Sequence, residues 1–253
     1  IAAAGSEMSN SCVITNEEGW YKKALDTDLA RPKFAIMNPE ITYTLPDYQT
    51  QCGCADIMMH TMERYFVLED TMEITDKIAQ DVMKNVMKYA KILKKDPENY
   101  EARAEIMWCG SLSHNGLTGC GTCGGDWATH LIEHELGGMF DVAHGAGLAA
   151  VWGSWARYVM DEKPERFAQF AVDVMGVKES DDVKSTALKG IEAVEDFYRM
   201  IEMPTNLKEL GITPTDEQIK DMAMKATNHD TQQLGAFKKL SAKDLVEIYK
   251  AAK

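Results

Sequence analysis

Long hydrophobic runs are missing from this 253-residue sequence. No segment approaches the roughly eighteen uninterrupted apolar residues of a membrane-spanning helix, and the first residues lack the basic-then-apolar order of a signal peptide. Basic residues are also scarce, because 27 Lys and Arg stand against 40 Asp and Glu, a formal charge of −13. This balance argues against nucleic acid or an anionic membrane as a partner. We therefore expect a cytoplasmic protein.

Cysteine pairs that could build a zinc ribbon or a redox site are missing as well. Cys120 and Cys123 form one C-x-x-C, but the sequence contains no second one. No βαβ pattern surrounds the pair, as a thioredoxin-like site would require. We therefore expect the six cysteines to be free thiols, most of them buried.

The hydrophobic pattern changes near residue 45. Before it, residues 11–15 and 33–37 read as β-strands separated by polar turns. After it, apolar residues recur every three or four positions, which is typical of helices that bury one face. This helical spacing is clearest in residues 62–68, 74–93 and 100–108. The sequence thus predicts a mainly α protein, a helical bundle with a short β segment at its N-terminus.

Several helix ends can be predicted from local chemistry. Pro46 followed by Asp47 suits a first helical turn, and Ser241 with Asp244 resembles a capping box. Pro214 and the residues after it predict another helix start, and Gly211 predicts the end of a short helix over 206–210. These ends divide the C-terminal part of the bundle into short helices.

Two pairs of residues have spacings that suit a metal site. Asp56 and His60 are four apart, so on a helix they share one face. His130 would add a ligand from a second helix. His144, which follows the Gly137-Gly138 pair, could return as a fourth ligand after a bend. Three imidazoles and one carboxylate suit a divalent transition metal, iron or zinc above all. His114 and His229 have no partner at a useful spacing, and we interpret both as structural or solvated.

The run from Asp126 to Ala149, with His130-Leu131-Ile132-Glu133-His134 inside it, resembles the iron-containing alcohol dehydrogenase family. Its butanol dehydrogenase and aldehyde reductase branch is the most similar. Gly5-Ser6-Glu7 and Gly53-Cys54-Ala55-Asp56, with His60 after them, match the same family in the same order. The resemblance covers the chain from its first residues into its C-terminal helices.

The resemblance implies a specific chemistry. The aligned positions hold the catalytic metal, and the residues here are Asp56, His60, His130 and His144. His134 would stand beside substrate and nicotinamide and relay the hydroxyl proton. The implied activity is NAD(P)-dependent interconversion of primary alcohols and aldehydes, with Fe²⁺ or Zn²⁺ as the metal. The implied fold is a helical bundle like the C-terminal domain of dehydroquinate synthase, and the implied assembly is a homodimer.

One part of the family pattern is absent. Family members begin with a nucleotide-binding domain whose Gly-Gly-Gly-Ser turn holds the pyrophosphate, and this sequence has no such motif. Its one G-x-G-x-x-G, residues 119–124, follows a helical pattern and therefore predicts a loop between helices rather than a dinucleotide site. We expect residues 1–44 to be remnant strands of a nucleotide-binding domain and residues 45–253 to be the helical catalytic domain. Gly5 and Ser6 would still contact NAD(P)H in a full-length protein, whereas this chain alone would be inactive.

Two other functions remain open at this stage. His130 to His134 is also a literal H-x-x-E-H, the pattern of metalloproteases in which both histidines bind zinc and the glutamate activates water. The third possibility is a catalytically silent metal-binding module. The Gly137-Gly138 pair is similarly ambiguous, because it predicts either room for a cofactor or substrate or the close packing of two helices.

Overall fold

The computed structural model describes residues 5–69 and 72–253. In these residues one β-hairpin is followed by α-helices, so the mainly α prediction is confirmed. The strands and short 3-10 helices are β1 (Ser11–Asn16), β2 (Tyr21–Asp26), η1 (Asp28–Ala30), η2 (Pro39–Thr42), η3 (Leu117–Gly119) and η4 (Met160–Glu162). The α-helices are α1 (Asp47–Tyr65), α2 (Glu73–Leu93), α3 (Tyr100–His114), α4 (Ala128–Phe140), α5 (His144–Val159), α6 (Pro164–Asp173), α7 (Val183–Met200), α8 (Asp216–Ala226) and α9 (Ala242–Ala251).

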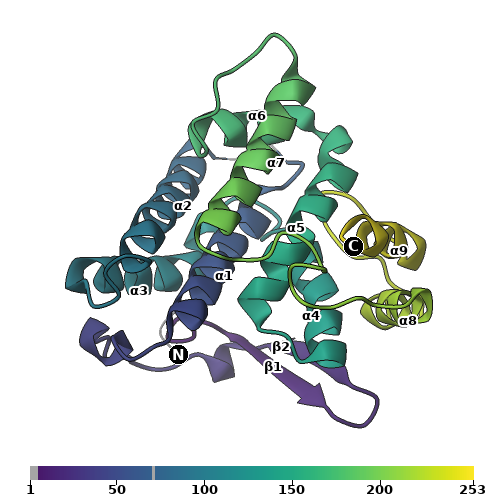
Figure 1. Cartoon of the computed structure of the whole chain (residues 1–253), viewed down its shortest axis with the longest axis horizontal. Coiled ribbons are helices and arrows are strands. Elements are labelled where there is room, and N and C mark those ends of the chain that lie inside the picture. Colours follow the sequence, from purple (N-terminus) through teal and green to yellow (C-terminus); the bar gives the residue numbers. More distant parts are fainter. Residues whose placement is uncertain (1–4, 70–71) are drawn as a thin grey trace.

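Helix α1 lies in the middle of the bundle and packs against α2, α3 and α5. Helices α4 and α5 pack on each other, α6 packs on α7, and α8 packs on α4 and α9 (Figure 1). The β-hairpin lies at one end of the bundle beside α4 (Figure 1). Since α1 has neighbours on several sides, nearly every side chain from Thr50 to Tyr65 is buried. This central helix is the one predicted to carry Asp56 and His60.

The hydrophobic core is continuous through the helices and includes Phe66 directly after α1. The Phe66 ring stacks on Phe167 with centroids 4.3 Å apart, and it touches Trp155 and Phe170 at tilted angles. These aromatic contacts join α1 to α5 and α6. The core therefore fixes the far end of the helix that carries the candidate site.

The predicted strand at 11–15 is confirmed as β1, but the predicted strand at 33–37 is wrong. β1 pairs antiparallel with β2, from Ser11 opposite Asp26 to Asn16 opposite Tyr21. Residues 33–37 form a bend and a segment without regular secondary structure. A strand here would require a neighbouring strand to supply hydrogen bonds, and among the described residues the sheet contains only β1 and β2.

Most predicted helix ends lie where the sequence placed them. Helix α1 begins at Asp47 behind Pro46, and Ser241 with Asp244 forms a capping box at α9. Thr215 and Gln218 form a second capping box at α8. The segment before Gly211 is a series of turns and not the predicted short helix. Residues 119–124 belong to the loop between α3 and α4, as predicted, and carry the exposed thiols of Cys120 and Cys123.

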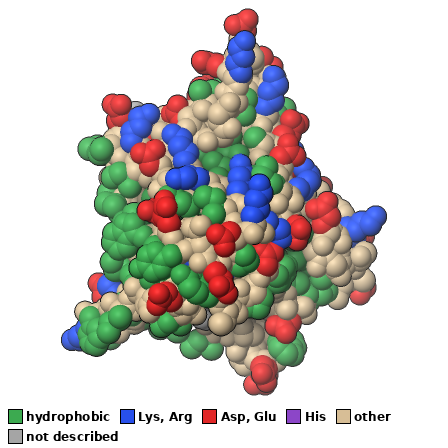
Figure 2. Space-filling model, turned by 60° about the vertical axis from the view of Figure 1, so that its left-hand side comes forward, with side chains coloured by type: hydrophobic (Ala, Val, Ile, Leu, Met, Phe, Trp, Pro, Cys, Tyr) green, Lys and Arg blue, Asp and Glu red, His purple; other side chains and the backbone are tan. Residues whose placement is uncertain are grey.

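The segment between β2 and α1 leaves large apolar side chains exposed. Leu29 is 95% exposed, and Phe34, Ile36 and Ile41 lie between 76% and 89%. Figure 2 brings forward the side of the molecule that carries α2 and α3, and hydrophobic side chains gather on that face. Within the described ranges, no helix combines the length and apolar character needed to cross a membrane.

Candidate metal centre

Three helices carry the predicted site residues to one place. Asp56 and His60 lie on successive turns of α1, and His130 lies in the first turn of α4. His144 is the first residue of α5. Asp141 ends α4 in the left-handed conformation, with φ of 52°, so the chain reverses within a few residues and brings His144 back beside His130. The bend that the sequence predicted is this short connection.

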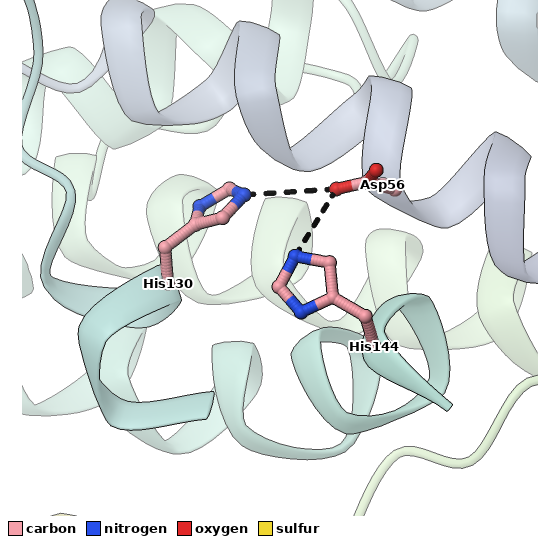
Figure 3. A group of neighbouring side chains, drawn as sticks. All are labelled: Asp56, His130 and His144. Carbon is pink, nitrogen blue, oxygen red and sulfur yellow. Dashed lines mark ion pairs between the residues drawn. The ribbon is translucent and has the colours of Figure 1, made fainter. Parts of the chain in front are cut away.

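One carboxylate oxygen is the common point of the cluster. Asp56 Oδ1 is 3.6 Å from Nε2 of His60, of His130 and of His144. Figure 3 shows the rings of His130 and His144 converging on this oxygen from α4 and α5. In Asp56, His130 and His144, all ligand atoms lie within 4.8 Å of one another. His60 shares the Asp56 contact but does not belong to that mutual group.

These residues fit a divalent transition metal. Ligand atoms about 2.1 Å from a tetrahedral ion lie about 3.4 Å apart, close to the 3.6 Å between Asp56 Oδ1 and each imidazole. Asp56 Oδ1 and His130 Nε2 are buried and have no hydrogen-bond partner among the described residues. Buried polar atoms without a partner are costly. A cation between them would offset that cost.

The electrostatics of the cluster favour negative charge on Asp56. Burial alone would raise the pKa of this carboxyl, but His60, His130 and His144 outweigh burial and lower it. Burial likewise opposes charge on His130, yet Asp56 and Glu63 raise the pKa of this imidazole to about 9. The pocket therefore holds Asp56 as a carboxylate that attracts positive charge from several sides.

A glycine contact lets α5 approach α1. A Cβ on Gly145 would overlap the backbone carbonyl of Cys52. Without that atom, the start of α5 lies directly against α1, and the imidazole of His144 reaches Asp56. The close packing of the two helices thus determines the position of one predicted ligand.

A pocket of about 410 Å³ opens above the cluster. Its polar lining includes the predicted ligands, Ser6, Arg64 and His114. The Trp127 ring, at the start of α4, forms part of the wall and lies 4.5 Å from the Arg64 guanidinium carbon. His114, interpreted from the sequence as structural or solvated, stacks on His60 with centroids 4.1 Å apart. The exposed His229 lies outside this pocket.

The predicted catalytic histidine, His134, also lines the pocket. It is 7% exposed, and its ring lies 5.7 Å from that of His144. Burial, followed by the positive neighbours His144 and His130, lowers the pKa of His134 to about 3 despite the nearby Glu133. Its Nδ1 atom has no hydrogen-bond partner among the described residues.

The glycines singled out in the sequence have different surroundings. A Cβ on Gly137 would stand 2.6 Å from Lys22 Nζ, and one on Gly138 would stand 2.9 Å from the Trp20 carbonyl oxygen. The Gly137-Gly138 pair therefore accommodates the β-hairpin, whereas the sequence predicted either room for a cofactor or substrate or the close packing of two helices. Gly5 has φ of 65° and lies against the backbone of α3. Ser6, next to it, faces the pocket.

Two buried carboxylates were missed by the sequence interpretation as partners of the ligands. Glu63 Oε1 accepts the backbone amide of His130 at 3.0 Å and lies 3.2 Å from its Nδ1. Glu133 Oε2 contacts Nδ1 of His144 and pairs with Lys22 Nζ at 3.4 Å. A signal for Glu63 was present, because it follows Asp56 by seven residues and His60 by three, on the same helix face.

This chain is similar in sequence to known proteins. The sequence model of the Fe-containing alcohol dehydrogenase family, C-terminal, matches residues 50–253. NADH-dependent butanol dehydrogenase A of Clostridium acetobutylicum is 34% identical over 251 residues, 99% of this chain and 64% of that protein. The NADPH-dependent aldehyde reductase YqhD of Escherichia coli is 32% identical over 254 residues, 100% of this chain and 64% of that protein.

A solved structure gives the same answer for the fold. The crystal structure of NADH-dependent butanol dehydrogenase A from Thermotoga maritima superposes with a TM-score of 0.92 and 35% identity. The superposition covers all of this chain and 64% of the Thermotoga protein. The sequence match and the shared fold confirm the resemblance found in the motifs, and the chain belongs to the Fe-containing alcohol dehydrogenase family.

Proposed function

We propose that this chain is the metal-binding helical part of an NAD(P)-dependent oxidoreductase that interconverts primary alcohols and aldehydes. The observation that carries the proposal is the convergence of three imidazole Nε2 atoms on one Asp56 oxygen, each at 3.6 Å, at a pocket. The relatives named above support the substrate class and the cofactor, since one is a butanol dehydrogenase and another an aldehyde reductase. Because one uses NADH and the other NADPH, the proposal covers both nicotinamides.

Four residues would hold the metal: Asp56, His60, His130 and His144. The family description favours Fe²⁺, and the mixed nitrogen and oxygen donors also suit Zn²⁺. When bound, such an ion supplies Lewis-acid polarisation of the alcohol or carbonyl oxygen. The hydride chemistry belongs to the nicotinamide.

His134 would move the hydroxyl proton. It lines the pocket beside His144, and its Nδ1 is free of hydrogen bonds to described residues, so it can accept a proton. Trp127 and Leu131 would exclude water from the reacting carbon, since both line the same pocket.

The remaining parts of the proposal concern the whole protein. Residues 1–44 would belong to a nucleotide-binding domain, with Gly5 and Ser6 near the cofactor, and residues 45–253 would form the catalytic domain. The chain spans 64% of its relatives, and it lacks the Gly-Gly-Gly-Ser turn. Without that part the nicotinamide is not oriented, which forfeits much of the several kcal/mol that positioning supplies. We therefore expect this chain alone to be inactive, and the complete enzyme to be a cytoplasmic homodimer acting on a small alcohol or aldehyde.

The H-x-x-E-H protease is not the function that the contacts support. Its glutamate must reach a zinc-bound water, but Glu133 is fully buried and engaged by His144 and Lys22. Among the described residues, His130 converges with Asp56 and His144, whereas His134 converges with Glu133 and His144, so the two histidines of the motif share no group of ligand atoms. Family membership argues in the same direction.

Metal content tests the four-ligand site. The purified chain is loaded with Fe²⁺ or Zn²⁺, dialysed and analysed for bound metal, beside His130→Ala and His144→Ala. We expect about one equivalent in the unmodified chain and little in either variant. His229→Ala is the matched control, because this exposed histidine lies outside the pocket. Full metal content in both ligand variants would refute the site.

Turnover tests the role of His134. In a full-length protein carrying this sequence, His134→Ala should keep its metal and lose most butanol oxidation and butyraldehyde reduction. Loss of metal from His134→Ala alone would instead favour the protease arrangement. The 253-residue chain is assayed in parallel with NADH and NADPH, and ordinary turnover by it would show that it holds a nucleotide site of its own.

A further inference from the structure

Each of two predicted ligand imidazoles has a buried carboxylate behind it. Glu63 Oε1 lies 3.2 Å from Nδ1 of His130, and Glu133 Oε2 contacts Nδ1 of His144. Both carboxylates are almost completely inaccessible, with side chains 1% and 0% exposed. The arrangement repeats on two different helices, since Glu63 lies on α1 and Glu133 on α4.

The contact at Nδ1 determines what the other ring nitrogen can do. In a neutral imidazole, as a metal ligand must be, a carboxylate that accepts Nδ1–H leaves Nε2 unprotonated and fixes the plane of the ring. The Nε2 atoms of His130 and His144 are the atoms that lie 3.6 Å from Asp56 Oδ1. Each glutamate thus presents the lone pair of its histidine to the same point in space.

Burying the two glutamates costs free energy, because one oxygen of each carboxylate is unpaired within the described part of the chain. Glu63 Oε2 and Glu133 Oε1 have no hydrogen-bond partner among the described residues, and a buried carboxylate oxygen without a partner is unfavourable. Lys22, on β2, balances the charge of Glu133 at 3.4 Å. Gly147 leaves space for the Glu133 side chain, because a Cβ there would stand 2.8 Å from its Cγ. The neighbouring elements therefore accommodate Glu133 in its place against His144.

We propose that Glu63 and Glu133 are positioning residues of the metal centre, which hold His130 and His144 with Nε2 directed at the ion. The inference rests on the proposed metal site and deepens it. Glu63 also accepts the backbone amide of His130 at 3.0 Å, so it fixes both the main chain and the ring of that ligand. Glu133 acts across the turn between α4 and α5, on the first residue of α5.

A purely structural role makes a different prediction from a positioning role. If these glutamates only support the helices, their replacement changes the stability of the metal-free chain and leaves the affinity of the folded chain for metal unchanged. If they orient ligands, metal affinity falls even where folding is preserved, typically by about 10-fold to 100-fold. The decisive measurement is therefore metal affinity in variants whose folding is checked separately.

The experiment titrates the metal-free chain with Co²⁺, whose visible absorption reports a bound ion. Glu63→Gln and Glu133→Gln keep the shape and one acceptor oxygen, whereas Glu63→Leu and Glu133→Leu remove the hydrogen bond. We expect the Leu variants to bind Co²⁺ about 10-fold to 100-fold more weakly and the Gln variants to lose less. Circular dichroism and urea unfolding of each metal-free variant establish that it is folded, and the Gln variants carry the test if a Leu variant does not fold.

Glu195→Gln is the matched control. Its carboxylate is largely buried and ion-paired with Arg157 at 2.5 Å, outside the pocket, so Co²⁺ affinity should not change. Unaltered affinity in folded variants of Glu63 and Glu133 would overturn the positioning role while leaving the metal site intact. An unmodified chain that binds no Co²⁺ would instead refute the metal centre, and with it the role of both glutamates.

Discussion

Asp126 accepts the backbone amide of Phe237 at 2.6 Å, although the two residues lie far apart in the sequence. The same oxygen accepts the amide of Ala236 at 2.6 Å, and the second oxygen accepts that of Ala128 at 3.1 Å. One buried carboxylate thus supports the first turn of α4 and holds the segment before α9 against it.

We expect Asp126→Ala to destabilise the chain by about 2–3 kcal/mol, because it leaves buried amides without an acceptor. Urea unfolding at neutral pH measures the loss. Asp126→Asn, which keeps one acceptor oxygen, should lose less. Asp81→Ala, an exposed acidic residue on α2, should stay within about 0.5 kcal/mol. A similarly small effect of Asp126→Ala would show that these hydrogen bonds are not needed.

The pH dependence of stability should contain a contribution from Glu135. Burial raises the pKa of this carboxyl to about 7, although Lys23 and Lys225 lower it. The folded state therefore binds a proton that the unfolded state releases near pH 4.5, so this contribution falls as pH rises from about 4.5 to 7.

Glu135→Gln removes that contribution. At pH 8 the variant should be more stable than the unmodified chain, by up to about 3 kcal/mol, and the difference should vanish below pH 4.5. Urea unfolding across this range measures it. Glu179→Gln, at an exposed position, should leave the pH profile unchanged. An equal gain from Glu135→Gln at every pH would contradict the assignment.

Two glycines at the start of α5 should respond differently to alanine. A methyl group on Gly145 meets the Cys52 backbone, which cannot move without separating α1 from α5. On Gly147 the nearest atom is Cγ of the buried Glu133, at 2.8 Å, and this side chain can shift more easily than a backbone. We expect Gly145→Ala to cost about 3 kcal/mol or more and Gly147→Ala less, about 1–2 kcal/mol. Thermal unfolding of both variants compares them, and the reverse order would mean that α5 is not held by its contact with Cys52.

Substitutions in the core and in the exposed apolar segment should differ in their effect on stability. Phe66→Ala removes a fully buried ring that stacks on Phe167 and should cost about 3–5 kcal/mol. Phe34 is 82% exposed, so Phe34→Ala should change stability by less than about 0.5 kcal/mol. A loss above 1 kcal/mol for Phe34→Ala in urea unfolding would show that this side chain is covered in solution.

Local chemistry was enough to predict most helices. The capping box of Ser241 and Asp244 and the Pro46 start depend on residues within one turn. Residues 33–37 could not be judged in this way, because a strand depends on a partner that composition does not reveal. The division into residues 1–44 and 45–253 stays a prediction, because it depends on a nucleotide-binding domain that this sequence does not contain.

The site was predictable where it follows helix geometry. Asp56 and His60 share a face of α1 at a spacing of four, and Glu63 continues that face. The contact of Lys22 with Glu133 could not be foreseen, because it depends on where the β-hairpin packs against α4. Spacing within a helix determines which side chains share a face, whereas the tertiary fold determines what that face meets.

Two exposed cysteines make the loop between α3 and α4 accessible to selective labelling. Cys120 and Cys123 are exposed there, in the loop that ends at Trp127, and Cys12 is exposed on β1. Burial raises the pKa of Cys52 to about 11 and those of Cys54 and Cys109 to about 12, so these thiols remain protonated and unreactive at neutral pH. A maleimide dye would therefore label the two loop thiols without touching the core once Cys12 is replaced by serine. Such a fluorophore, attached near the rim of the pocket, would turn the entry of a ligand into an optical signal.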